Sequence, residues 1–166
     1  MIQALRQVAR GFALLGAAVA LATGILAVVS IIGRAVWHRP IPGDVELTQF
    51  GIALAISLGL PWCQLRKANI IVDFFTQRLS PRRLQWLDGI GALLLSAMCA
   101  LLAWRSAVGA VAVHQAFETS MILSLPMWWV YASLAPGLAL AALVALVQAL
   151  AHFAGRPLDA AAQEAA

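Results

Sequence analysis

Hydrophobic residues form four long stretches along the chain, and the segments between them hold nearly every charge. The stretches cover residues 11–33, 47–65, 89–104 and 127–151. An α-helix rises about 1.5 Å per residue, so roughly 20 residues cross a hydrocarbon layer about 30 Å thick. The first, second and fourth stretches meet this length without a charged residue, which predicts that they span a membrane as helices.

The third stretch is too short to span alone, because Asp88 and Arg105 bound it. We therefore extend its helix to residues 84–110 and expect both charged side chains to reach toward a membrane interface. The pattern predicts an all-α membrane protein. Residues 1–166 then form one domain of four transmembrane helices, with spans near 11–33, 47–65, 84–110 and 127–151.

Composition supports a membrane protein and excludes several other classes. Hydrophobic residues make up 63% of the chain and charged residues 11%, against roughly 45–50% and 25% in soluble domains. The spans use most of the chain, so the remaining loops cannot bury a soluble catalytic core. The formal charge of +4 would suggest nucleic acid for a soluble chain. Here the basic residues flank apolar spans, so we expect membrane lipids and no nucleic acid as partners.

The distribution of Lys and Arg predicts the orientation, because cytoplasmic segments are enriched in these residues. Placing both termini in the cytoplasm leaves Arg34, Arg39 and Arg105 outside and every other Lys and Arg inside. The opposite orientation reverses this ratio. We therefore expect a multi-pass protein of a bacterial inner membrane with both termini cytoplasmic. The span at 11–33 is too long for the apolar region of a typical signal peptide and is read as retained.

Small residues recur at every fourth position of each span. In the second span they are Gly51, Ala55 and Gly59, which we take as candidates for contact with a partner subunit. This spacing places them on one helix face and lets helices approach closely, although an alanine-rich chain also forms such rows by chance. We expect a compact bundle. The other rows are Gly16, Ala20 and Gly24; Ala92, Ser96 and Ala100; and Ser133, Gly137, Ala141, Ala145 and Ala149.

The longest connection between spans contains a second pattern. Its hydrophobic residues follow i, i+3, i+4 spacing around Phe74 and Phe75, with basic groups at both ends. This predicts a short amphipathic helix over residues 68–79 that lies in the cytoplasmic interface. Asp73 lies within it, and its expected place is a solvated face, with a salt bridge to a partner as the alternative. Pro81 is predicted to open the third helix.

Candidate chemistry is sparse. The three histidines, His38, His114 and His152, fall in connections or at a span end and not inside the predicted bundle, where haem ligands would have to lie. Cys63 and Cys99 occur without a CxxC motif or a ligand cluster, and we read them as small hydrophobic residues. No arrangement typical of a catalytic triad or a metal site is present in the sequence. We therefore expect no cofactor, no metal and no enzymatic activity.

Two acidic residues precede the second span. Asp44 and Glu46 would complement the positive end of the dipole of that helix. A capping role is the simpler interpretation for both. Arg34 and Glu46 are also candidates for holding a partner subunit, with membrane-interface contact and helix capping as their alternative roles.

Several short motifs occur in a fixed order. The first group is Arg34, Glu46 with Leu47, Arg66 with Lys67, Val72 with Asp73, and Leu79 to Pro81. The second group is Ser124 to Tyr131, followed by Pro136 and Gly137. In this order and spacing they resemble the small membrane subunit of tripartite ATP-independent periplasmic (TRAP) transporters. The resemblance covers nearly the whole chain. Two departures are Asn69, where the family often has His, and Val45, where it usually has a second carboxylate.

The resemblance implies a sodium-coupled importer of organic anions. A periplasmic solute-binding protein would capture the solute, and a large multispan permease subunit would carry the transport path and the sodium ions. This chain would pack beside the permease as a scaffold, and the lack of charged residues in mid-span fits that role. The candidate residues for partner contact are Arg34, Glu46, Gly51, Ala55, Gly59 and Asp73.

Two alternatives remain at this point. The small subunit of a tripartite tricarboxylate transporter would have a similar size and number of spans, and Glu46 with Val72 and Asp73 distinguishes it from the TRAP subunit. A haem-bearing membrane anchor of an oxidoreductase would need paired histidines inside the bundle.

Overall fold

The computed structural model describes residues 2–38, 41–66 and 81–155. It contains four long helices, and each is long and apolar enough to cross a membrane. They are α1 (Ile2–Trp37), α2 (Asp44–Leu65), α3 (Pro81–Gln115) and α4 (Trp128–Phe153). The predicted all-α class with four transmembrane helices is therefore confirmed. The amphipathic helix expected over residues 68–79 lies outside the described residues.

All four helices extend beyond the spans that hydropathy marks, α1 and α3 at both ends. The first was expected at 11–33 and begins at Ile2, and the third was expected at 84–110 and continues to Gln115. Hydropathy locates the hydrocarbon layer, whereas a helix continues as long as its backbone bonds are made. Charged side chains such as Arg10 are tolerated on the extra turns because these reach the interfaces.

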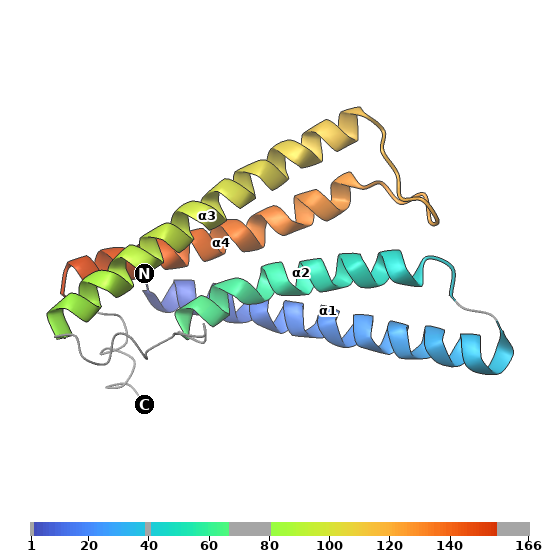
Figure 1. Ribbon diagram of the computed structural model, residues 1–166, viewed down its shortest axis with the longest axis horizontal. Coiled ribbons are helices and arrows are strands. Elements are labelled where there is room, and N and C mark those ends of the chain that lie inside the picture. Colours follow the sequence, from blue (N-terminus) through green and yellow to red (C-terminus); the bar gives the residue numbers. More distant parts are fainter. Residues whose placement is uncertain (1, 39–40, 67–80, 156–166) are drawn as a thin grey trace.

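The helices form two hairpins, α1–α2 and α3–α4, that meet through α2 and α4 (Figure 1). Their lateral order is α1, α2, α4, α3, so α1 and α3 form the two sides of the molecule. Both hairpin connections lie at one end, which we call the loop end, and the chain begins at the other (Figure 1). The expected compact bundle is thus an open row in which only α2 and α4 have helices on both sides.

The contact between α1 and α2 follows a seven-residue repeat on α1. Its buried residues are Ala9, Gly16, Thr23 and Ser30. A repeat of seven keeps one narrow stripe of a helix against its neighbour in a left-handed crossing. The row expected at every fourth position was wrong here, because Ala20 and Gly24 are exposed.

Helix α4 supplies most of the core, and its small-residue row is confirmed except at Ser133, which is half-buried. Gly137, Ala141, Ala145 and Ala149 are all buried. On α3, Ser96 donates a hydrogen bond from its hydroxyl to the carbonyl of Ala142 at 2.9 Å. The remaining row on α3 is partly wrong: Ala92 and Ser96 are buried, whereas Ala100 is exposed and Cys99 takes the inner position.

Helices α2 and α4 approach each other closely at Ser57 and Gly137. A Cβ atom at Gly137 would overlap the carbonyl and hydroxyl of Ser57. Pro61 has no N–H to bond that carbonyl within α2, so the carbonyl lies against α4 instead. The Ser57 hydroxyl donates to the carbonyl of Leu134 at 2.8 Å. Gly137 has no side chain and Pro61 has no N–H. Together these two features allow the hairpins to cross at this point.

Candidate functional site

At the loop end, polar side chains of the first hairpin form a small network. Asp44, the first residue of α2, accepts hydrogen bonds from the hydroxyl of Ser30 and from Arg34 Nη2, the latter at 3.3 Å. Its other oxygen accepts the N–H of Val45 at 2.8 Å. The Ser30 hydroxyl in turn accepts the N–H of Ile41 at 3.4 Å. The network ties the last turns of α1 to the first turn of α2.

The ion pair within this network is unequally exposed. The side chain of Arg34 is 62% exposed and that of Asp44 is 19% exposed. Only one guanidinium nitrogen contacts the carboxylate, and a surface pair of this kind contributes little to stability by itself. Arg34 therefore keeps exposed donors that a partner or a lipid headgroup can use.

Glu46 connects the two hairpins. Its carboxylate accepts the backbone N–H of Ile122 at 2.9 Å and that of Leu123 at 3.2 Å, both from the connection between α3 and α4. A carboxylate that accepts two backbone N–H groups makes charge-assisted bonds. Sequence reasoning had offered capping or partner contact for this residue. The structure gives it a role inside the chain, as a clamp on the second connection.

Gly43 allows the connection between α3 and α4 to pack against the start of α2. Its backbone adopts φ +72°, a left-handed conformation that favours glycine, and it is buried. A Cβ atom there would overlap the side chain of Leu123. The connection also forms backbone hydrogen bonds within itself. The N–H of Ser120 donates to the carbonyl of Leu125 at 2.9 Å, and the N–H of Met127 donates to the carbonyl of Glu118 at 3.1 Å. The loop end is therefore one packed unit built from both connections.

The other predicted contact residues lie elsewhere. A Cβ atom at Gly51 would overlap Thr23 of α1, and one at Gly16 would lie 3.0 Å from the carbonyl oxygen of Ala55 and 3.4 Å from the nitrogen of Gly59. This face of α2 therefore packs against α1 of the same chain. Contact of these three residues with a partner stays a prediction. Asp73 lies outside the described residues.

A polar pair lies between α2 and α4 near the end opposite the loop end. Gln64 Nε2 donates to Gln148 Oε1 at 2.8 Å, and Gln148 Nε2 donates to the Gln64 carbonyl at 3.0 Å. Gln148 is buried. Sequence reasoning did not single out either residue, although a Gln within an apolar span is itself a signal, because side-chain amides in hydrocarbon bond to a neighbouring helix.

The histidines and cysteines fall in different parts of the structure. His114 meets Trp128 edge-on, with ring centroids 5.3 Å apart. His38 is exposed at the end of α1, and His152 is buried on α4. Cys63 is exposed and Cys99 is buried. Within the described part of the chain, no three His, Cys, Asp or Glu residues are grouped as a metal site would require.

Together these contacts fasten helices to one another and present no reactive arrangement of groups. Residues 23–155 match a protein family described as "Tripartite ATP-independent periplasmic transporters, DctQ component". The chain belongs to this family. No curated protein and no solved structure matches it.

The DctQ match includes every contact that joins the helices at the loop end. Ser30, Asp44, Glu46 and residues 120–127 all lie within it. It covers α1 from its second half onward and all of α2, α3 and α4. With four helices able to cross a membrane, this DctQ-family chain is a multi-pass membrane component of a TRAP transporter.

Proposed function

We propose that this chain is a scaffold subunit that holds the large permease of a TRAP-type secondary transporter in a bacterial inner membrane. The permease would import an organic anion together with sodium ions, and a periplasmic binding protein would deliver the solute. The sodium and solute sites would lie in the permease, and this chain would bind no cofactor. Its termini would be cytoplasmic and its loop end periplasmic.

The observation that carries this proposal is how the interior of the chain is filled. The inner stripe of α4 consists mainly of small buried residues, with Gln148 and His152 near its C-terminal end, and α4 packs on α2 and α3. The hydroxyls of Ser57 and Ser96 are bonded to carbonyls of α4. An anion path needs exposed polar or charged groups at mid-depth, whereas the residues buried at the middle of α4 are small and apolar. A rigid support for another subunit needs only such packing.

The outward faces support the same role. Large hydrophobic side chains are exposed along α1 and α3, the two sides of the row. Apolar surface of this extent needs lipid or another membrane protein to cover it. A scaffold has both available, with the permease on one side and lipid on the other.

The proposal is tested by transport in proteoliposomes. Permease and binding protein are reconstituted with and without this chain, and uptake of the solute is followed with and without a sodium gradient. We expect uptake only with all three proteins and with the gradient. The affinity of the binding protein for its solute should be the same with or without this chain. Full uptake by the permease and binding protein alone would contradict the scaffold role.

A further inference from the structure

The connection between α3 and α4 exposes large apolar side chains at its tip. Met121 is 100% exposed and Ile122 is 60% exposed, and Phe117, where the connection leaves α3, is 86% exposed. Exposed apolar groups that lie together mark a contact with a protein or a membrane. We propose that Met121 and Ile122 insert into the lipid bilayer, at the boundary between headgroups and acyl chains, and anchor the loop end there.

The length of α2 sets the depth of this tip. Helix α2 has 22 residues, the fewest of the four helices, and is about 33 Å long at 1.5 Å per residue. The hydrocarbon layer is about 30 Å thick, so a crossing helix of this length begins and ends at the two boundaries. Arg66 follows α2 directly, and its guanidinium lies 5.1 Å from the centre of the Trp62 ring. Glu46, in the first turn, therefore lies at the opposite boundary, and Ile122 and Leu123 lie there with it because they bond to its carboxylate.

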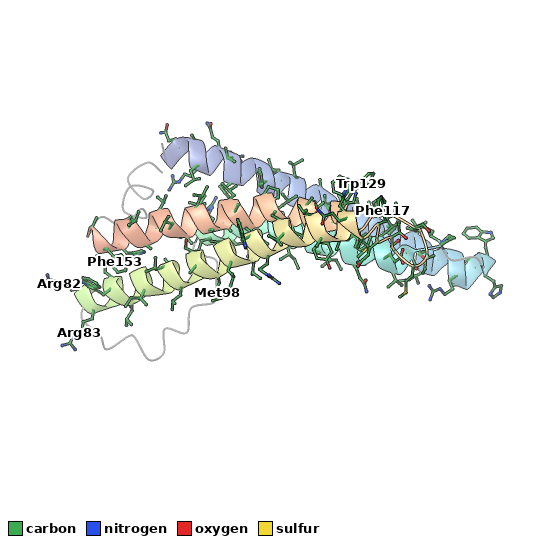
Figure 2. All side chains as sticks on the ribbon, turned by 90° about the horizontal axis from the view of Figure 1, so that it is seen from above. Arg82, Arg83, Met98, Phe117, Trp129 and Phe153 are labelled. Atoms are coloured by element: carbon green, nitrogen blue, oxygen red, sulfur yellow. The ribbon has the colours of Figure 1, made fainter. Side chains whose placement is uncertain are left out.

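The start of α4 agrees with this depth. Trp128 and Trp129 open α4 directly after the connection, and Trp129 is exposed. Indole rings favour the boundary between headgroups and hydrocarbon. Figure 2 shows Phe117 and Trp129 in the same region, where α3 and α4 meet the connection. Both the residues that follow the connection and the helix that holds its tip thus lie at one boundary of the membrane.

Much of the backbone of the connection is hydrogen-bonded within the chain. Against lipid, a non-helical backbone cannot leave its N–H groups without acceptors. The carboxylate of Glu46 accepts those of Ile122 and Leu123. The Ser120 hydroxyl accepts that of Leu125 at 3.2 Å. Water would satisfy these groups if the connection lay in solution, whereas a tip in the bilayer needs acceptors from the chain. Backbone carbonyls accept the N–H groups of Phe117, Glu118, Ser120 and Met127.

The side chains of the connection divide between the protein and its surroundings. The side chain of Leu123 lies against Gly43 at the start of α2, whereas Met121 stands fully clear of the described residues. A protein partner would need a pocket shaped for such a protruding side chain, while fluid acyl chains accommodate it without one. The exposed polar residues of the connection suit the headgroup layer, which borders water. They are Glu118, Thr119 and Ser124.

The charge beside the tip also matches phospholipid. The carboxylates of Asp44 and Glu46 accept hydrogen bonds from within the chain. The side chain of Asp44 is mostly covered, whereas that of Arg34 is largely exposed. The charge that faces outward from this cluster is therefore a guanidinium, which binds phosphate through paired hydrogen bonds. Phospholipid headgroups present phosphate at this depth. The proposal goes beyond the scaffold role and does not depend on it.

The first test measures the depth of a fluorescent label on a single cysteine. The full-length chain without its native cysteines carries Met121→Cys and is reconstituted in vesicles of phosphatidylcholine brominated at a shallow or a deep position of the acyl chains. We expect the label to be quenched several-fold more by the shallow bromines than by the deep ones, and only weakly by iodide in the water. Quenching by iodide with none by either lipid would overturn the proposal.

Two control positions calibrate this measurement. Leu21 is exposed in the middle of α1, and Gln3 is exposed at its start. The label on Leu21→Cys should respond most to the deep bromines, and the label on Gln3→Cys should respond to iodide. A label at Met121 that behaves like the one at Gln3 would place the tip in water and contradict its insertion.

The second test distinguishes lipid from a protein partner. The labelled Met121→Cys chain is assembled with the permease and the binding protein in the same vesicles. We expect its quenching by the shallow bromines to stay unchanged. Loss of this quenching on assembly would show that a protein covers Met121, which would overturn the assignment to lipid. If no complex forms, the proposed function fails, whereas the first test still decides whether the tip inserts.

The third test removes the acceptor that holds the tip. Glu46→Ala leaves the N–H groups of Ile122 and Leu123 without a carboxylate, so the tip should move toward water. The label on Met121→Cys should then be quenched several-fold more by iodide. Glu118→Ala leaves these bonds intact and should behave like the parent chain, and the elution volume in detergent checks that both variants fold. Unchanged quenching with Glu46→Ala would overturn the dependence of insertion on the Glu46 bonds.

Discussion

The carboxylate of Glu46, in the first turn of α2, accepts the backbone N–H of Ile122 at 2.9 Å, across 76 residues of sequence. This bond and its neighbour from Leu123 link the first hairpin to the connection of the second. Elsewhere, the two hairpins meet mainly along α2 and α4. Glu46 therefore determines where the second connection rests.

Replacing Glu46 should release that connection. Glu46→Ala removes both acceptor oxygens, so amide hydrogen exchange at residues 120–123 should become several-fold faster. Glu46→Gln keeps one carbonyl oxygen and should give an intermediate rate. Glu118→Ala changes an exposed acid of the same connection and serves as the control. Unchanged protection in Glu46→Ala would show that the packing of Leu123 on Gly43 is sufficient by itself.

A methyl group at Gly137 should disturb the crossing of α2 and α4. It would overlap the carbonyl and hydroxyl of Ser57, and overpacking of this kind lowers the free energy of unfolding by about 1–3 kcal/mol. Unfolding in detergent followed by circular dichroism measures the change. Gly91→Ala is the control, because a Cβ there meets no atom within 4 Å. Equal stability of both variants would contradict the close approach.

The amides of Gln64 and Gln148 should be energetically coupled. A double-mutant cycle with leucine at each position should give a coupling free energy of about 0.6 kcal/mol, with an upper limit near 1.7 kcal/mol, as for other hydrogen bonds between membrane helices. A second cycle at Gln49 and Gln115, which are both exposed, should be additive. Additivity in both cycles would mean that the bonds seen between α2 and α4 do not contribute to stability.

The loop end of the helices and the opposite end should lie on opposite sides of the membrane. A chain without its native cysteines receives a single cysteine at Gln115 or at Gln3, both exposed. A membrane-impermeant maleimide added to intact spheroplasts should label the cysteine at Gln115. The cysteine at Gln3 should react only after permeabilisation, because the basic segments favour the cytoplasm. The reverse pattern would refute the proposed orientation.

The sequence by itself determined the four spans and the fold class. In hydrocarbon, the backbone N–H and C=O groups have no water to bond. Long apolar stretches therefore have to become helices, which make these hydrogen bonds internally. It also determined the small-residue row of α4. A membrane helix that packs closely against neighbours on both sides needs small residues at its contacts. The order of short motifs from Arg34 to Pro81 was enough to indicate the family.

Only the tertiary structure decided which faces meet. A row of small residues permits contact but does not choose a neighbour, and only the structure placed Gly51 against Thr23. Glu46 could be read as a cap because the backbone N–H donors that it bonds lie 76 and 77 residues away in sequence. Long-range pairing depends on how whole helices cross, and a local pattern does not contain that information.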